Sequence, residues 1–267
     1  MKPAALLLAF MLPLLLAAQS PAPAGWQLVW SDEFDRDGAP DPAKWDYDLG
    51  GDGWGNKELQ HYTARRENAR VEHGRLVLEA RREPWQGNAY TSARLVTRGK
   101  ADWQYARIEV RAKLPAGRGT WPAIWMLPVT HDLGSGLWPD IGEIDLMEHV
   151  GYEPGVVHGS LHNQRHNGDK GGKPVTAQTL VPDASERFHT YALEWDAEEI
   201  RIFVDDVCYF TDRKNGADWR RWPYQQKFYL ILNVAVGGYW GGVKGVDESV
   251  FPARLEVEFV RVYQRKK

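Results

Sequence analysis

The sequence has little cysteine and little net charge. Its one cysteine, Cys208, excludes a disulfide within the chain. Cys208 lies in an apolar run, so we expect an unreactive thiol in the core. Lysine and arginine number 33 and aspartate and glutamate 36, which leaves a net charge of −3. This balance argues against a nucleic-acid partner, because nucleic-acid-binding domains normally carry a basic face.

Long hydrophobic runs are absent apart from one at the N-terminus. Lys2 precedes the apolar run 4–18, which Pro13 interrupts and small residues follow. A positive charge, a short apolar region and small residues are typical of a secretory signal peptide, and the run is too short for a membrane-spanning helix. We therefore expect a signal peptide over residues 1–20, cleaved between residues 18 and 24. The mature protein is expected to be secreted or periplasmic, with no membrane partner.

Helical periodicity is also scarce, whereas short strand-like segments are frequent. Residues 107–114 and 255–263 alternate between apolar and polar side chains, as half-buried strands do. Residues 228–236 form an apolar run that suits a strand buried on both faces. Glycine and proline separate these segments, and no linker or repeat occurs after residue 25. The pattern predicts one all-β domain over residues 25–267, a sandwich or jelly roll.

Tryptophan is the residue type in excess, with 13 in the chain. Its flat apolar ring with one polar N–H suits stacking on the C–H face of a sugar, and it also suits a large core. Composition alone leaves both uses open.

The most informative motif is the acidic segment 142–148, GEIDLME. Alternate side chains of a strand share a face, so Glu143 and Asp145 point the same way. Glu148 joins them only if one residue bulges near Leu146, and bulges are common beside active sites. The two glutamate carboxylates then come within about 5–6 Å, the separation of a retaining glycosidase. A solvent-facing charged strand and a calcium ligand set are the alternatives, but like charges on one face cost stability, which favours a functional cluster.

Several motifs in order resemble the laminarinase-like members of glycoside hydrolase family 16. The resemblance covers essentially the whole mature chain and rests on residues 30–34, 53–60, 90–94, 120–127, 142–148, 188–191, 233–242 and 260–263. It implies a concanavalin-like jelly-roll β-sandwich with an open cleft on the concave sheet. It also implies endo-cleavage of β-1,3-glucan with retention of configuration, and no cofactor required for catalysis.

The resemblance assigns catalytic roles to three residues. Glu143 would be the nucleophile, and Glu148 the general acid and then the general base. Asp145 would hydrogen-bond Glu143 and help to keep neighbouring carboxyls in opposite protonation states. Repulsion between ionised carboxylates should raise the pKa of Glu148.

Further residues are expected to bind the sugar. Trp121 and Trp125 alternate around Ala123, so both rings can face one side of a strand. The resemblance places the substrate-binding residues at the cleft: Asn56, Arg94, Trp121, Trp125, Trp138, His162 and Trp240. By contrast, Trp26, Trp30, Trp45 and Trp195 are expected in the core.

Two sets of residues are candidates for binding metal. His158 and His162 share a strand face, but zinc needs at least one more protein ligand. Many relatives carry a structural calcium, and the matching positions are Glu33 and Glu258, where relatives usually have Asp in place of Glu258. The alternative for these carboxylates is pairing with Lys or Arg, and the sequence leaves both open.

The expected function is a secreted, monomeric endo-1,3-β-glucanase acting on a polysaccharide. One alternative is a β-1,3-1,4-glucanase or another polysaccharide hydrolase on the same scaffold. The other is a non-catalytic glucan-binding protein. Proteins of that kind typically lack one or both glutamates, and here both Glu143 and Glu148 are present.

Overall fold

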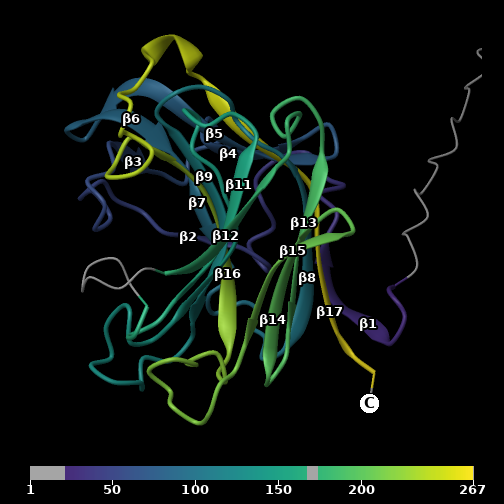
Figure 1. Ribbon diagram of the computed structural model, residues 1–267. Coiled ribbons are helices and arrows are strands. Elements are labelled where there is room, and N and C mark those ends of the chain that lie inside the picture. Colours follow the sequence, from purple (N-terminus) through teal and green to yellow (C-terminus); the bar gives the residue numbers. More distant parts are fainter. Residues whose placement is uncertain (1–21, 167–173, 267) are drawn as a thin grey trace, which may run out of the picture.

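The chain folds as a sandwich of two β-sheets. The computed structural model describes residues 22–166 and 174–266. Nearly all regular structure in this part is β-strand, with one short 3₁₀ turn, η1 (Glu248–Val250). The two sheets face each other, and the C-terminus follows β17 beside β1 (Figure 1). The predicted all-β jelly-roll sandwich is confirmed, whereas the predicted signal peptide lies outside the described residues, apart from the end of its cleavage range.

The larger sheet has ten strands. Its order is β15 (Val207–Arg213), β14 (Glu199–Val204), β13 (His189–Trp195), β8 (Ala106–Lys113), β17 (Ala253–Arg265), β5 (Arg75–Trp85), β6 (Asn88–Ser92) and β3 (Gln60–Tyr62), with β1 (Trp26–Asp32) beside β17 and β4 (Ala69–Glu72) beside β5. The smaller sheet has seven strands, in the order β12 (Val175–Leu180), β11 (Val156–His162), β10 (Glu143–Glu148), β9 (Thr120–Pro128), β16 (Phe228–Val236), β7 (Arg94–Val96) and β2 (Asp46–Tyr47). No helix among the described residues is long and apolar enough to cross a membrane.

The burial of individual strands follows the sequence pattern. β8 alternates between buried and half-buried residues, with its apolar side chains inside. All nine residues of β16 are buried, because β16 lies between β9 and β7 in the smaller sheet. Its inner face packs on the main core, and its outer face lies under Trp125 and Leu127. This strand forms the floor on which the candidate site is built.

The predicted core tryptophans lie in or against the core. Trp26, Trp45 and Trp195 are buried, and Trp30 packs partly buried against Trp45. The prediction for Cys208 is wrong, because Cys208 is exposed. Cys208 lies on the edge strand β15 beside a register shift, so its side chain is exposed although the neighbouring residues are apolar.

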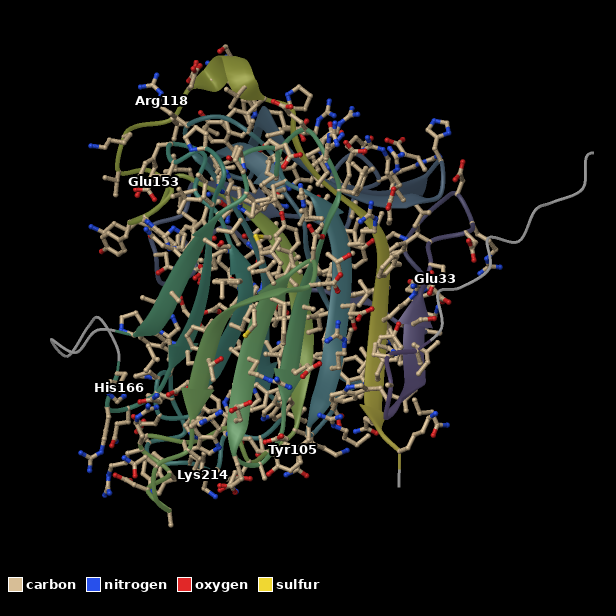
Figure 2. All side chains as sticks on the ribbon, turned by 45° about the vertical axis from the view of Figure 1, so that its right-hand side comes forward. Glu33, Tyr105, Arg118, Glu153, His166 and Lys214 are labelled. Atoms are coloured by element: carbon tan, nitrogen blue, oxygen red, sulfur yellow. The ribbon has the colours of Figure 1, made fainter. Side chains whose placement is uncertain are left out.

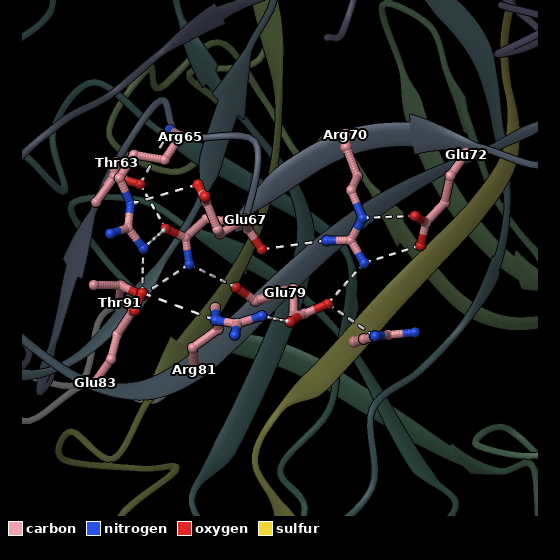
Figure 3. Close-up of polar contacts among 11 residues, drawn as sticks. Thr63, Arg65, Glu67, Arg70, Glu72, Glu79, Arg81, Glu83 and Thr91 are labelled. Atoms are coloured by element: carbon pink, nitrogen blue, oxygen red, sulfur yellow. Dashed lines mark hydrogen bonds and ion pairs between the residues drawn. The ribbon is translucent and has the colours of Figure 1, made fainter. Parts of the chain in front are cut away.

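A buried carboxylate in β5 binds several arginines on the larger sheet. Glu79 has no exposed side-chain surface and forms ion pairs with Arg70 at 2.8 Å, Arg254 at 2.9 Å and Arg81. Figure 3 shows Glu79 between Arg70 and Arg81. The network joins β4, β5 and β17 through side chains as well as through backbone pairing.

Glu79→Ala is expected to destabilise the fold by about 3–5 kcal/mol, because it removes the buried anion that three guanidinium groups share. Of these groups, Arg70 alone keeps another carboxylate of the described chain at hydrogen-bond distance, Glu72 at 2.8 Å. For a domain of this size the melting temperature should fall by roughly 6–20 °C. Thermal unfolding of Glu67→Ala is the control, because the Glu67 carboxylate is 58% exposed and 4.0 Å from Arg65. Equal melting shifts in the two variants would show that the Glu79 network contributes no more than a surface pair.

Candidate active site

A cleft of about 1120 Å³ crosses the outer face of the smaller sheet. Strands β9, β10, β11 and β16 form its floor, and loops around residues 54–58, 138–141 and 239–240 form its walls. Its volume exceeds the roughly 300–1,000 Å³ of typical small-ligand pockets. The cleft lining includes each residue predicted to act in catalysis or sugar binding: Asn56, Arg94, Trp121, Trp125, Trp138, Glu143, Asp145, Glu148, His162 and Trp240.

The predicted bulge in β10 is present. On the β9 side Asp145 pairs with Trp125 and Met147 with Ile124, so Leu146 is the extra residue. The pairing with β11 shifts over the same interval, between Asp145 and Glu148. Ile144, Leu146 and Met147 are therefore fully buried in the core, while the three acidic side chains line the cleft. One inserted residue brings Glu148 to the face that Glu143 already occupies.

The three carboxyl groups of the cleft floor have raised pKa values. Burial is the main cause, and it raises the pKa of Glu143 and of Glu148 to about 8. Burial also raises the pKa of Asp145 well above its usual value. The neighbouring Asp145 raises the pKa of both glutamates further, as like charges do. The increase at Glu148 was predicted from repulsion between carboxylates, whereas its main cause is burial. The increase at Glu143 was not predicted, because the sequence does not show how far the cleft walls exclude water.

Nearby donors oppose this effect at each glutamate. The charge of His162 lowers the pKa of both glutamates, and the charge of Arg94 lowers that of Glu143 as well. The indole N–H of Trp121 donates to Glu148 Oε1 at 3.1 Å and lowers the pKa of that group. The two glutamates therefore have different partners within one buried cluster, which is how neighbouring carboxyls come to play different roles.

His162 faces two of the carboxylates. Its Nε2 lies 3.2 Å from Asp145 Oδ2 and 3.6 Å from Glu143 Oε1. Within the described part of the chain these three residues are the one group of His, Cys, Asp or Glu side chains close enough to bind a metal ion together, with ligand atoms within 4.8 Å. His158 does not join them, since its Nε2 faces Glu153 at 3.6 Å. His158 and His162 share a strand face but contact different carboxylates.

Comparison with known proteins identifies the family. Residues 56–259 match the model of glycosyl hydrolases family 16. The chain belongs to glycoside hydrolase family 16. A β-glucanase of Rhodothermus marinus is 60% identical over 250 residues, covering 90% of this chain and 85% of the relative. The predicted resemblance is confirmed, and the chain is a glycosidase.

Solved structures support the same assignment. The laminarinase from Rhodothermus marinus superposes with a TM-score of 0.88 at 59% identity, covering 91% of this chain and 98% of that one. The endo-β-1,3-glucanase from Pyrococcus furiosus superposes with a TM-score of 0.81 at 38% identity, covering 91% and 95%. The jelly-roll architecture is therefore that of solved glucanases.

Aromatic rings lie on both sides of the acidic cluster in this family 16 cleft. Trp240 packs edge-on against Trp121 at 5.6 Å and against His158 at 4.9 Å. Trp138 packs against the His162 ring at 5.6 Å and is 39% exposed. Exposed rings in a cleft are suited to stacking on sugar.

Trp138→Ala is expected to raise KM on laminarin roughly tenfold, since stacking of a base on an aromatic ring is worth about 1–3 kcal/mol and 1.4 kcal/mol is one decade. Its melting temperature should hardly change. Trp195→Ala should do the opposite, because Trp195 is 1% exposed and a core Trp→Ala costs about 3–5 kcal/mol. Melting and KM measured on both variants separate the two roles. A Trp138→Ala enzyme that melts far lower and binds normally would make Trp138 a core residue.

The structure also shows cleft residues to which the sequence assigned no role. One is Trp54, whose ring centroid lies 4.7 Å from the guanidinium of Arg94. The same guanidinium lies 4.6 Å from the centroid of the Trp125 ring and 3.1 Å from Asp48 Oδ2. The other such residues in the lining include Glu58, Ser160, Thr176, Asn233 and Tyr239. Trp54, Glu58, Asn233 and Tyr239 fall within the family motifs, which is the signal that could have identified them. Ser160 lies between His158 and His162 on one strand face, so strand alternation could have identified it. Thr176 has no such signal, because only the pairing of β12 with β11 places it there.

The two carboxylates considered for calcium are held by arginines. Glu33 accepts two hydrogen bonds from Arg261, at 3.0 and 2.8 Å, and Glu258 accepts one from Arg111 at 2.6 Å. Glu33 lies at the opposite side of the molecule from His166, which follows the cleft strand β11 (Figure 2). Each carboxylate is paired with an arginine side chain, so these two residues do not fit a calcium site. The alternative, pairing with Lys or Arg, is the one that the structure shows for both residues.

Proposed function

We propose that the chain is a secreted endo-1,3-β-glucanase that cleaves laminarin-type glucan as a monomer, by retaining double displacement. The observation that carries this proposal is the bulged β10, which gathers Glu143, Asp145 and Glu148 in one aromatic-lined cleft. The relatives named β-glucanase and laminarinase support it, at 60% and 59% identity.

In the first step the ionised carboxylate of Glu143 attacks the anomeric carbon. The bond from that carbon to the glycosidic oxygen breaks, and the leaving oxygen takes the proton of Glu148. The product is a glycosyl ester on Glu143 and a glucan fragment with a new hydroxyl group. His162, whose Nε2 lies 3.6 Å from Glu143 Oε1 and 3.2 Å from Asp145 Oδ2, offsets the charge of the nucleophile and holds Asp145 beside it.

In the second step Glu148 acts as a base. It takes a proton from water while the water oxygen attacks the anomeric carbon, and the ester bond to Glu143 breaks. Glu143 returns to its ionised form and Glu148 to its protonated form. Two inversions at the same carbon leave the product in the starting β-configuration.

Product analysis tests both the linkage and the stereochemistry. The enzyme should cleave laminarin into a range of oligosaccharides, and proton NMR early in the reaction should show the β-anomer first. The α-anomer should appear only by mutarotation. An initial α-product would contradict the double displacement, and an unchanged laminarin sample would contradict the substrate assignment.

A second candidate has a specific observation in its favour. A solved family 16 structure described as a non-specific endo-β-1,3(4)-glucanase superposes with a TM-score of 0.86 at 44% identity. Lichenan and agarose assayed beside laminarin decide the matter. Cleavage of laminarin and lichenan at similar rates would favour the broader specificity, and cleavage of agarose would favour another polysaccharide hydrolase.

A glucan-binding protein without catalysis is the remaining alternative. A β-1,3-glucan-binding protein of Penaeus monodon is 38% identical over 57% of this chain. Binding of laminarin with no hydrolysis would support this alternative. The presence of all three acidic residues in the cleft favours the enzyme.

Secretion rests on the sequence alone, because residues 1–21 lie outside the described part of the structure. Expression of the full chain in a bacterial host with an export pathway, followed by N-terminal sequencing, tests it. The mature protein should begin between residues 18 and 24 and should be recovered outside the cytoplasm.

A further inference from the structure

The loop between β2 and β3 has an unusual backbone where it reaches the cleft. Trp54 and Lys57 both have positive φ, of 50° and 54°, and so have Gly53 and Gly55. Side-chain-bearing residues adopt this region at a cost and keep it only where surrounding contacts impose it. The loop carries Trp54 and Asn56 into the cleft lining, so whatever imposes this conformation also places two sugar-facing side chains.

Glu58 makes the contacts that hold this loop. Its Oε1 accepts from Asn56 Nδ2 at 3.2 Å, and its Oε2 accepts from Gln60 Nε2 at 2.6 Å and from the Tyr62 hydroxyl at 3.3 Å. Its backbone forms an isolated bridge with Gly237, and Tyr239 N donates to Asn56 O at 2.7 Å. Side chain and backbone together fix the loop against the end of β3 and against the segment after β16.

The same carboxylate is linked to the floor of the cleft. Tyr62, whose hydroxyl donates to Glu58, also accepts from Asn233 Nδ2 at 3.0 Å. The indole N–H of Trp125 donates to Asn233 Oδ1 at 2.7 Å. One continuous chain of hydrogen bonds therefore runs from Asn56 through Glu58, Tyr62 and Asn233 to the Trp125 ring.

We propose that Glu58 is a positioning residue for glucan binding, which fixes the Asn56 amide and the Trp125 ring in one arrangement. The proposal rests on the proposed function. Because Asn56 Nδ2 donates to Glu58, Asn56 Oδ1 is the atom left to accept a hydrogen bond from a sugar hydroxyl. Glu58 itself stays engaged with protein donors and does not need to contact the sugar.

A carboxylate is the group that this position requires. Three donors converge on the two oxygens of Glu58, and a carboxylate has only acceptors to offer them. Glutamine would replace one oxygen with an N–H₂ group that faces a donor. Either Asn56 would then turn its amide or the link to Tyr62 would break, and in both cases the sugar-facing groups would move.

The test compares Glu58→Gln with wild type on laminarin and on a laminari-oligosaccharide of defined length. KM should rise about tenfold, as expected for one misaligned hydrogen-bond network, while kcat stays within about twofold. The pH limbs of kcat should not move, because Glu143 and Glu148 are unchanged. Glu186→Gln is the matched control, since Glu186 is exposed and does not line the cleft.

A paired substitution makes the test specific. In the double variant Glu58→Gln, Asn56→Asp, the amide N–H at position 58 can donate to the carboxylate at position 56. The contact therefore returns with donor and acceptor exchanged. The second carboxylate oxygen at position 56 still faces the cleft. KM should recover most of its loss. A structural role alone would lower the melting temperature of Glu58→Gln and leave KM unchanged, and that result would overturn the proposal.

Three further outcomes are also decisive. If Glu58→Gln fails to fold, Glu58→Asp keeps the charge but shortens the reach, and a KM equal to wild type in that variant would overturn the proposal. A wild-type enzyme that does not cleave laminarin would contradict the proposed function instead. A wild-type enzyme that cleaves laminarin, beside a Glu58→Gln enzyme with normal KM, would contradict only the role of Glu58.

Discussion

Glu143→Gln is expected to lower kcat on laminarin by several orders of magnitude while glucan binding persists. Glutamine has nearly the same shape as glutamate, but its amide does not attack the anomeric carbon. The aromatic rings and Arg94 are untouched, so the variant should still bind laminari-oligosaccharides, which calorimetry measures directly. Near-normal turnover would exclude Glu143 as the nucleophile, and Glu186→Gln, an exposed carboxylate outside the cleft, is the control.

The same variant is expected to be more stable than wild type at alkaline pH. Burial raises the pKa of Glu143 from 4.5 to about 8, so between these values the folded state binds more protons than the unfolded state. Stability of the wild type therefore falls as pH rises through this window. Glu143→Gln removes that dependence, so its melting temperature should exceed that of wild type at pH 8 and match it more closely at pH 4. A melting temperature of Glu143→Gln below that of wild type at pH 8 would show that folding does not raise the pKa of Glu143.

The acidic site could be predicted because its chemistry is local. An odd spacing between Glu143 and Glu148, with apolar residues between them, requires a bulge if both side chains are to share a face. The structure places that bulge at Leu146. The alternation of β8 and the continuous apolar run of β16 are local in the same way, and both were predicted correctly.

The features that the sequence did not predict depend on contacts between distant segments. Glu58 reaches Trp125 only through Tyr62 and Asn233, which come from β3 and β16. Cys208 is exposed because its strand lies at the edge of a sheet, and the apolar run around it carries no sign of that position. The raised pKa of Glu143 follows from burial in a cleft that several strands and loops build together.

Glu148→Gln is expected to slow laminarin hydrolysis by about 10²–10⁴-fold, the usual contribution of general acid–base catalysis. The wild-type rate should follow a narrow bell in pH, since activity requires Glu148 protonated and Glu143 ionised while the pKa of each glutamate is raised to about 8. Burial raises the pKa of Glu148 to about 8, so the alkaline limb should lie well above the range of an ordinary glutamate. Above that limb Glu148 has lost the proton that the leaving oxygen needs. The pH profile of kcat/KM on laminarin should therefore lose its alkaline limb in Glu148→Gln.

The choice of leaving group distinguishes an acid from a residue that merely shapes the cleft. An activated aryl glucoside needs little proton donation, so its glycosylation step, measured as a burst, should slow much less in Glu148→Gln than that of laminarin. Trp121→Phe offers a second measurement, because it removes the N–H that lowers the pKa of Glu148. The alkaline limb should then move to higher pH. If both substrates slowed equally at the glycosylation step, or if the Trp121→Phe limb moved to lower pH, Glu148 would not be the proton donor.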